Sequence, residues 1–120
     1  MNEIIEKEEI KIENMIYEIR GKQVMIDRDL AKLYKCTNGT KDINKAVKRN
    51  IERFPEDFYF QLTREESDNL RFQNGTTNMS RSLPYVFAEQ GEAKLSSVLK
   101  SNIASNISVG IMRAFVSMRK

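Results

Sequence analysis

Residues 27–54 of this 120-residue chain, DRDLAKLYKCTNGTKDINKAVKRNIERF, carry the pattern that decides the fold. In the first part of this stretch, Leu30, Leu33 and Tyr34 follow one another at the spacing of one helix face. Asp27 precedes them and is a residue type that caps helix starts. We therefore expect a short amphipathic helix with Asp27 as its N-cap.

A turn and a second helix follow. The dipeptide Asn38-Gly39 favours a turn over residues 35–40. A second helix is expected over residues 41–53, because Pro55 disfavours helical backbone at the residue before it. A short helix, a turn and a second helix together form a helix-turn-helix pattern.

The second helix is expected to be amphipathic and basic on its outer side. At about 100° per residue, Ile43, Val47 and Ile51 share one apolar stripe, which continues to Phe54 and has Ala46 on its edge. In helix-turn-helix pairs the second helix enters the major groove, where cations contact phosphates and asparagine can pair with adenine. An ordinary solvated helix face is the alternative. From this helix, the residues expected to bind DNA are Lys41, Asn44, Lys45, Lys48 and Arg49.

Asn50 falls inside the apolar stripe, between Val47 and Phe54. A buried amide must find hydrogen-bond partners. We therefore expect Asn50 to tie this helix to a neighbouring backbone, with a base contact as the alternative. Its loss should cost on the order of 1–3 kcal/mol of stability.

A second DNA-binding surface is expected in the polar loop of residues 73–82, which contains no acid. Amides and hydroxyls of such a loop suit contacts to phosphate and sugar. Arg71 and Arg81 frame it and are expected to contribute to DNA binding. A plain flexible connection is the alternative.

Alternating sequences outside this region predict strands. Residues 15–26 alternate on both sides of Gly21, which suits a tight turn, and predict a β-hairpin. Residues 58–62 and 83–87 predict two further strands. Pro84 places the latter at a sheet edge or at a strand start.

Helices are expected between and after these strands. Thr63 and Glu66 have the spacing of a capping box, so a helix should begin there and run to about residue 72. Residues 89–100 and 104–119 predict two more helices. The whole indicates a small α+β domain with a β-hairpin, a helix-turn-helix-like pair, further short strands and two C-terminal helices.

The last helix carries a wide apolar stripe, in which Ile107, Ile111 and Phe115 lie on one line. Part of this stripe should pack on the domain's own core. The rest is expected to face a second copy, giving a homodimer, or a C-terminal segment; full absorption into the core is the alternative. Three residues widen the stripe: Met112, Val116 and Met118.

Charge is unevenly distributed. The net charge is +3, yet residues 1–13 contain five glutamates and two lysines, a net of −3, which leaves +6 for residues 14–120. We expect a mobile acidic leader over residues 1–13 and one folded domain over residues 14–120. A basic body suits a polyanionic partner.

Residue types exclude several classes of function. The chain has one cysteine, Cys36, and no histidine, so an internal disulfide, a structural zinc site and imidazole-based catalysis are ruled out. The adjacent acids Glu65 and Glu66 are explained by the capping box. We expect no enzymatic activity, no metal and no cofactor. With no apolar run of about 20 residues and no signal peptide, no membrane association and a cytoplasmic location in a bacterial host are expected.

Several ordered blocks resemble the KilA-N DNA-binding domain family, the N-terminal domain of many phage and prophage antirepressor-like proteins. The similarity covers about residues 14–118, nearly the whole expected domain. The turn over residues 35–40 is about two residues longer than the family form, and Glu92 and Lys94 stand where the family tends to be apolar, so full burial of their helix is not expected. The blocks are MIYEIRGKQVM (15–25), DLAKLY (29–34), VKRNIERFPEDF (47–58), LPY (83–85), Phe87, EQG (89–91), LSSVL (95–99) and IMRAF (111–115).

This resemblance implies a sequence-specific duplex-DNA-binding domain of a phage or prophage antirepressor-like transcription regulator, without catalytic residues. Such domains are usually joined to a variable C-terminal domain, which we expect to be missing from this chain. The alternative is a protein-interaction module that binds a repressor protein. Steep salt dependence of binding, caused by counterion release, would distinguish DNA binding from this alternative.

Overall fold

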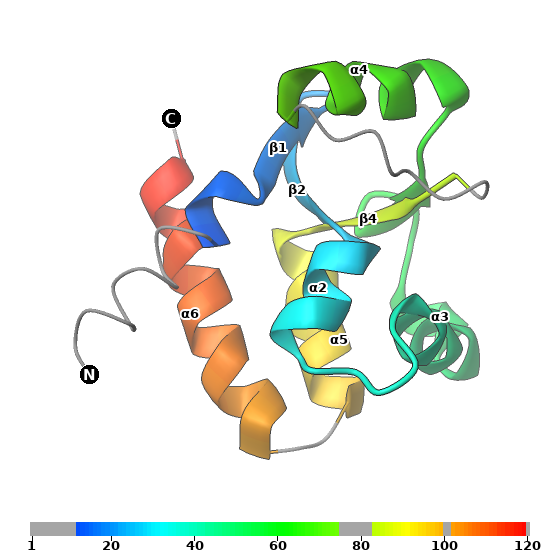
Figure 1. Ribbon diagram of the computed structural model, residues 1–120. Coiled ribbons are helices and arrows are strands. Elements are labelled where there is room, and N and C mark those ends of the chain that lie inside the picture. The colour runs from blue at the N-terminus through cyan, green and yellow to red at the C-terminus, as the bar shows by residue number, and fades with distance from the viewer. Residues whose placement is uncertain (1–11, 75–82, 100–101, 120) are drawn as a thin grey trace.

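A four-stranded antiparallel sheet lies at the centre of the fold (Figure 1). The computed structural model describes residues 12–74, 83–99 and 102–119. The strand order in the sheet is β1-β2-β4-β3, which confirms the expected α+β class. The strands are β1 (Ile16–Ile19), β2 (Lys22–Ile26), β3 (Tyr59–Gln61) and β4 (Tyr85–Ala88).

The predicted hairpin is confirmed. Ile19 pairs with Lys22, so two residues form the turn, Arg20 at φ 55° and Gly21 at φ 73°. Positive φ at both central residues gives a turn whose twist matches that of the strands. Gly21 adopts this conformation without steric cost, whereas Arg20 does so against its preference.

Strand β4 occupies a central place and pairs with both β2 and β3. Pro84 comes directly before it, and the Pro84 carbonyl accepts a hydrogen bond of 2.9 Å from the Leu62 amide. The strand start, and not the sheet edge, is therefore what tolerates this proline.

Helices cover both faces of the sheet. Alternation along β2 sends Val24 and Ile26 to one face, where they pack with Leu70 of α4, and Met25 to the other. Figure 1 shows α4 above the sheet and α2, α5 and α6 below it. The helices are α2 (Asp27–Leu33), α3 (Thr40–Arg49), the 3-10 helix η1 (Ile51–Arg53), α4 (Arg64–Asn74), α5 (Glu89–Leu99) and α6 (Asn102–Met118).

Helix α5 approaches the sheet closely because it carries Gly91. A Cβ atom at this position would lie 2.0 Å from the Phe58 carbonyl oxygen. Any side chain there would push the helix away from the backbone that leads into β3. Gly91 therefore sets the distance between α5 and this edge of the sheet.

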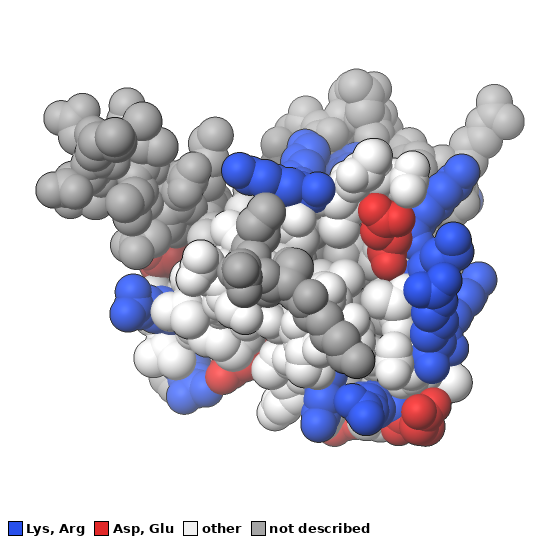
Figure 2. Space-filling view, turned by 90° about the horizontal axis from the view of Figure 1, so that it is seen from below, with Lys and Arg blue, Asp and Glu red and all other residues white. Residues whose placement is uncertain are grey.

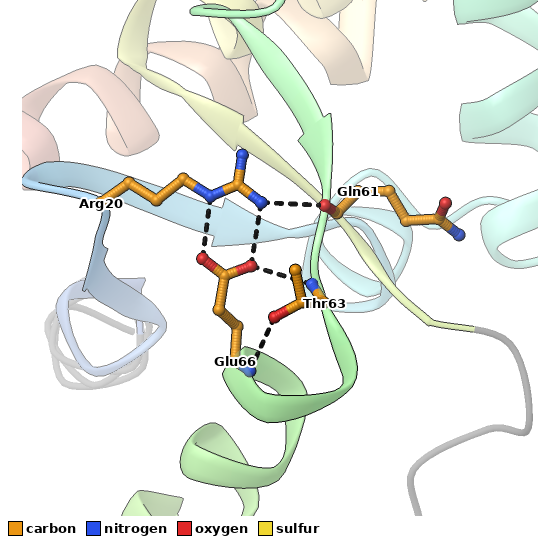
Figure 3. Close-up of polar contacts among 4 residues, drawn as sticks. All are labelled: Arg20, Gln61, Thr63 and Glu66. Carbon is orange, nitrogen blue, oxygen red and sulfur yellow. Dashed lines mark hydrogen bonds and ion pairs between the residues drawn. The ribbon is translucent and has the colours of Figure 1, made fainter.

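A polar cluster joins the hairpin turn to the start of α4 (Figure 3). The Arg20 guanidinium donates hydrogen bonds of 2.8 and 3.0 Å to the Glu66 carboxylate. The Thr63 amide donates to Glu66 at 2.8 Å, and the Glu66 amide donates to the Thr63 hydroxyl at 3.1 Å, which confirms the predicted capping box. The hydrogen bonds from Arg20 lower the pKa of Glu66 to about 2.

Helix α5 is not fully buried, as expected, but Glu92 is not one of the residues that face solvent. Glu92 is 0% exposed, whereas Lys94 is exposed, as are Gln90, Ala93 and Ser97. The Tyr34 hydroxyl donates a hydrogen bond to Glu92 Oε1, and the Ser108 side chain hydrogen-bonds to the same carboxyl group, while Oε2 has no hydrogen-bond partner among the described residues. Burial raises the pKa of Glu92 to about 8.

The expected helix start at Asp27 is also corrected. Asp27 is the first residue of α2, and the N-cap position belongs to Ile26. Its carboxylate is 5% exposed and accepts a hydrogen bond of 3.3 Å from the Tyr85 amide of β4. From the first position of α2, Asp27 thus ties the helix to the sheet, and its carboxylate also accepts a hydrogen bond from the Arg28 amide.

The second helix of the pair is shorter than predicted. It begins at Thr40 and ends at Arg49, because Asn50 leaves helical backbone at φ −131°. Ile51 then falls on η1 and is 55% exposed, so its expected burial in the apolar stripe is wrong.

Other boundaries follow the sequence with small shifts. Helix α4 extends to Asn74, so the expected loop over residues 73–82 begins later, and residues 75–82 lie outside the described residues. Residues 1–11 of the expected leader also lie outside them, whereas Ile12 is buried in the core at 5% exposure. The two C-terminal helices are confirmed. None of the described helices is both long and apolar enough to cross a bilayer.

Candidate nucleic-acid interface

Helices α2 and α3 form the predicted pair, joined by a turn that closes on the end of α2. The Cys36 amide donates a hydrogen bond of 2.9 Å to the Ala31 carbonyl. Lys35 and Gly39 both adopt positive φ, 55° and 61°. The left-handed residues reverse the chain, so that α3 begins directly after Gly39.

The start of α3 is held by Asp42. Its carboxylate accepts hydrogen bonds from the Asn38 amide at 3.1 Å and from the Asn38 side chain at 3.2 Å. These bonds lower the pKa of Asp42, so the group stays ionised near neutral pH. The one acid within α3 is thereby engaged with the turn.

One side of α3 is buried and the other is a cationic surface. Ile43 and Val47 are 0% exposed and pack in the core with Phe54. Figure 2 shows a row of Lys and Arg side chains along the edge of the molecule on which α3 lies. We call the exposed cations of α3 the basic face: Lys41, Lys45, Lys48 and Arg49.

A shallow hollow accompanies the basic face. Lys41, Lys45 and Lys48 line it, together with Asn38, Thr40, Asn44 and the acid Asp42. Because Asn38 holds the Asp42 carboxylate, the cations and amides of the hollow can offer hydrogen-bond donors to an anionic chain such as a phosphate backbone.

Asn44 differs from the four cations of α3 because it is turned toward the sheet. It is half-buried, and the Tyr59 hydroxyl of β3 donates a hydrogen bond of 3.4 Å to Asn44 Oδ1. The Asn44 side chain also hydrogen-bonds to the Asp27 carboxylate. Of the five residues expected to bind DNA from this helix, four are free to meet a ligand and Asn44 is engaged within the domain.

The two arginines outside α3 are placed differently. Arg71 lies on α4, which covers the face of the sheet opposite to α2 and α5 (Figure 1). Arg81 lies outside the described residues. The structure therefore puts Arg71 in another layer from the basic face.

Two exposed cations were missed because of the assumed helix boundary and the turn. Arg53 lies on η1, after the break at Asn50, and Lys35 lies in the turn before α3. Both flank α3 along the chain. The sequence did place Lys35 in a predicted turn beside a basic helix, and this position could have indicated Lys35 as a further DNA-binding candidate.

Asn50 donates a hydrogen bond of 2.9 Å from Nδ2 to the Ala46 carbonyl. The bond closes the last turn of its own helix, and not a neighbouring backbone as the sequence suggested. Such side-chain bonds satisfy carbonyls that a helix end leaves unpaired.

Asn50→Ala should therefore lower the free energy of unfolding by about 1 kcal/mol. Thermal denaturation of the variant checks this, and its affinity for DNA should stay close to that of the original chain. Unchanged stability together with a large loss of DNA affinity would instead make Asn50 a DNA contact.

The apolar stripe of α6 divides into a buried and an exposed part. Ile111 and Phe115 are 0% exposed and belong to the core, while Val116 of the same stripe is 54% exposed; Val109, outside the predicted stripe, is 51% exposed. A groove beside the two valines is lined by Met112, by Arg113 and by serines of α5 and α6. The stripe is thus not wholly absorbed into the core.

The homodimer through this helix stays a prediction. Sedimentation velocity over a range of concentrations should show the average sedimentation coefficient rising with concentration. The paired substitution Val109→Ser and Val116→Ser should remove this rise. A constant coefficient for the original chain up to high concentration would leave the dimer without support.

No three Asp, Glu, Cys or His side chains gather to hold a metal ion in the part of the chain that the structure describes. Burial raises the pKa of the Cys36 thiol, so thiolate character at neutral pH is low.

Comparison with known proteins gives one family. A family model described as the ORF6N domain matches residues 14–98, from the hairpin to near the end of α5. No curated protein and no solved structure gave a significant match. The matched region contains the α2–α3 pair and the whole sheet. The chain belongs to the ORF6N domain family, a phage-associated family.

Proposed function

We propose that this chain is a non-catalytic, sequence-specific duplex-DNA-binding domain of a phage or prophage regulator, acting in the bacterial cytoplasm. Within this proposal the domain acts in an antirepressor-like transcription regulator, as the resemblance to KilA-N domains implies. Membership of a phage-associated family agrees with this setting.

The basic face of α3 is the observation that carries the proposal. Lys41, Lys45, Lys48 and Arg49 are all exposed, and the acid within the helix, Asp42, is held by Asn38. The helix is the second of a helix-turn-helix-like pair, which is the element that enters the major groove in such domains. Exposed cations at this position suit phosphate contacts on either side of the groove.

The net charge distribution supports the same partner. Residues 14–120 carry a net charge of +6, although the whole chain carries only +3. A cationic body attracts DNA over distances of about a Debye length, roughly 8–10 Å at physiological salt. The protein and DNA would thus first associate through this attraction, and α3 would then dock in the major groove.

A protein-interaction module is the second candidate function. Its support is the half-exposed valine pair of α6, Val109 and Val116, on a groove with few charges. Exposed apolar strips of this kind suit a protein partner such as a repressor. This surface is separate from the basic face, so each function can be tested alone.

Fluorescence polarisation with a labelled mixed-sequence duplex tests the DNA proposal. Binding at micromolar protein concentration and low salt is expected, with affinity falling steeply as salt rises. A repressor-binding module without DNA affinity would leave the polarisation unchanged at every salt concentration, and this result would contradict the proposal.

A further inference from the structure

The buried stripe of α3 is narrow, and it leaves the rotation of the helix about its own axis weakly defined. Ile43 and Val47 are its fully buried residues among those the structure describes, and they lie on one line, four residues apart, with the partly buried Ala46 packed on the core beside them. Apolar contacts of this kind are not directional. A helix held in this way needs a second contact, at another angle around its axis, to fix where its outer side chains point.

Asn44 supplies that contact. It follows Ile43 by one residue, about 100° around the helix. Its side chain lies between the Asp27 carboxylate of α2 and the Tyr59 hydroxyl of β3, 3.4 Å from the latter. Hydrogen bonds are directional, so these two partners define the rotation of α3 in a way that Ile43 and Val47 do not.

Both partners of Asn44 are themselves fixed. Asp27 is 5% exposed and is anchored to β4 through the Tyr85 amide. The Tyr59 ring stacks on the Tyr85 ring at a centroid distance of 4.9 Å and an interplanar angle of 5°. Phe54, which ends the chain segment after α3, contacts Tyr59 edge-on at 5.9 Å. The hydrogen bonds of Asn44 therefore connect α3 to a rigid part of the sheet.

Asn44 also shares a row with the cations it would orient. Lys41 precedes it by three residues and Lys48 follows it by four, and both spacings bring side chains to the same side of a helix. We propose that Asn44 is a positioning residue, which fixes the rotation of α3 through Asp27 and Tyr59 and so aims the basic face, and that it does not contact DNA bases. The proposal deepens the DNA-binding function and rests on it.

A double-mutant cycle between Asn44→Ala and Tyr59→Phe tests this proposal. Tyr59→Phe removes only the hydroxyl and keeps the ring that stacks on Tyr85. Tyr59→Phe should weaken duplex binding about fivefold, the size of one hydrogen bond, and Asn44→Ala, which loses the bonds to both partners, should weaken it at least as much. The double variant should bind like Asn44→Ala alone, whereas the losses of two independent sites would multiply.

Tyr85→Phe is the matched control, because it removes a hydroxyl from the stacked ring and leaves the bond between Asn44 and Tyr59 in place. It should bind DNA like the original chain. All titrations are made well below the melting temperature of each variant, so that a merely structural loss of stability does not change the measured affinity.

Hydrogen exchange of the α3 amides, measured without DNA, gives a second readout. Exchange should be faster in Asn44→Ala and Tyr59→Phe than in the original chain and in Tyr85→Phe. The proposal is overturned if Tyr59→Phe binds DNA normally while Asn44→Ala does not, since Asn44 would then touch DNA itself. Unchanged hydrogen exchange in α3 of the two variants would overturn it as well. This readout needs no DNA, so it tests the positioning role even if the original chain does not bind DNA, a result that would contradict the proposed function alone.

Discussion

Replacing Lys45, Lys48 and Arg49 together with alanine is expected to weaken duplex binding by about 100-fold at low salt. All three side chains are exposed on α3, and none of them belongs to the buried stripe that holds the helix. Each lost phosphate contact should also reduce the slope of log affinity against log salt by about one unit, so the triple variant should lose about three.

A matched control separates the effect of the basic face from the effect of the total charge of the protein. Arg64, Lys94 and Arg113 are also exposed, but they lie on α4, α5 and α6. Their triple alanine variant has the same net charge as the first and should bind DNA far better than it does. Equal affinities of the two variants would mean that overall charge, and not the basic face, attracts DNA.

Glu92→Gln is expected to raise the free energy of unfolding by about 2 kcal/mol at pH 7. The pKa of Glu92 is about 8 in the folded protein, against an ordinary value of 4.5. Between these two pH values the folded chain holds a proton that the unfolded chain has released. Stability from this group is therefore fully present below pH 4.5 and is lost as pH rises toward 8.

The size of the effect follows from the pKa difference. At pH 7 this proton release lowers the free energy of unfolding of the original chain by about 3 kcal/mol. Glutamine removes that loss, but its unpaired amide costs about 1 kcal/mol, so the net gain is about 2 kcal/mol. Glutamine keeps an oxygen that accepts the hydrogen bond from Tyr34. Near pH 5 the variant should therefore be no more stable than the original chain.

Chemical denaturation at several pH values between 5 and 8 measures this difference. Glu66→Gln is the control of opposite sign, because Arg20 lowers the pKa of Glu66 to about 2. Glu66 contributes stability above pH 4.5 and loses it as pH falls toward 2, so its replacement should destabilise the protein at pH 7. A stability gap between Glu92→Gln and the original chain that does not widen from pH 5 to pH 8 would contradict the assignment.

Elements that depend on local sequence were predictable. The hairpin around Gly21 and the capping box of Thr63 and Glu66 are set by residues adjacent in the chain, and both are found where expected. The exposure of Lys41, Lys45 and Lys48 also follows from helical periodicity alone.

Features that depend on packing between distant elements were not predictable. The sequence showed Glu92 as a polar residue on a helix, whereas its burial depends on elements distant in the chain, such as the end of α2, where Tyr34 hydrogen-bonds to it. Asn44 belongs to the expected basic helix, and only the position of β3 reveals its bond to Tyr59. Arg71 is expected to bind DNA because it frames the polar loop; the structure places it on α4, which covers the other face of the sheet, and its contact with DNA stays a prediction.

The burial predicted for Ile51 was wrong for a different reason. Periodicity continued past position 49, but the backbone at Asn50 leaves the helix and rotates the following residues away from the stripe. Proline at position 55 set an upper limit for the helix end, and it did not reveal this earlier break.

The central claim, that α3 binds duplex DNA, is tested most directly by following backbone amide resonances of the labelled domain during a titration with duplex DNA. The largest shifts are expected for residues 40–49 and the adjoining turn, and added salt should reverse them. Shifts confined to α6, or no shifts at DNA concentrations well above that of the protein, would contradict the claim.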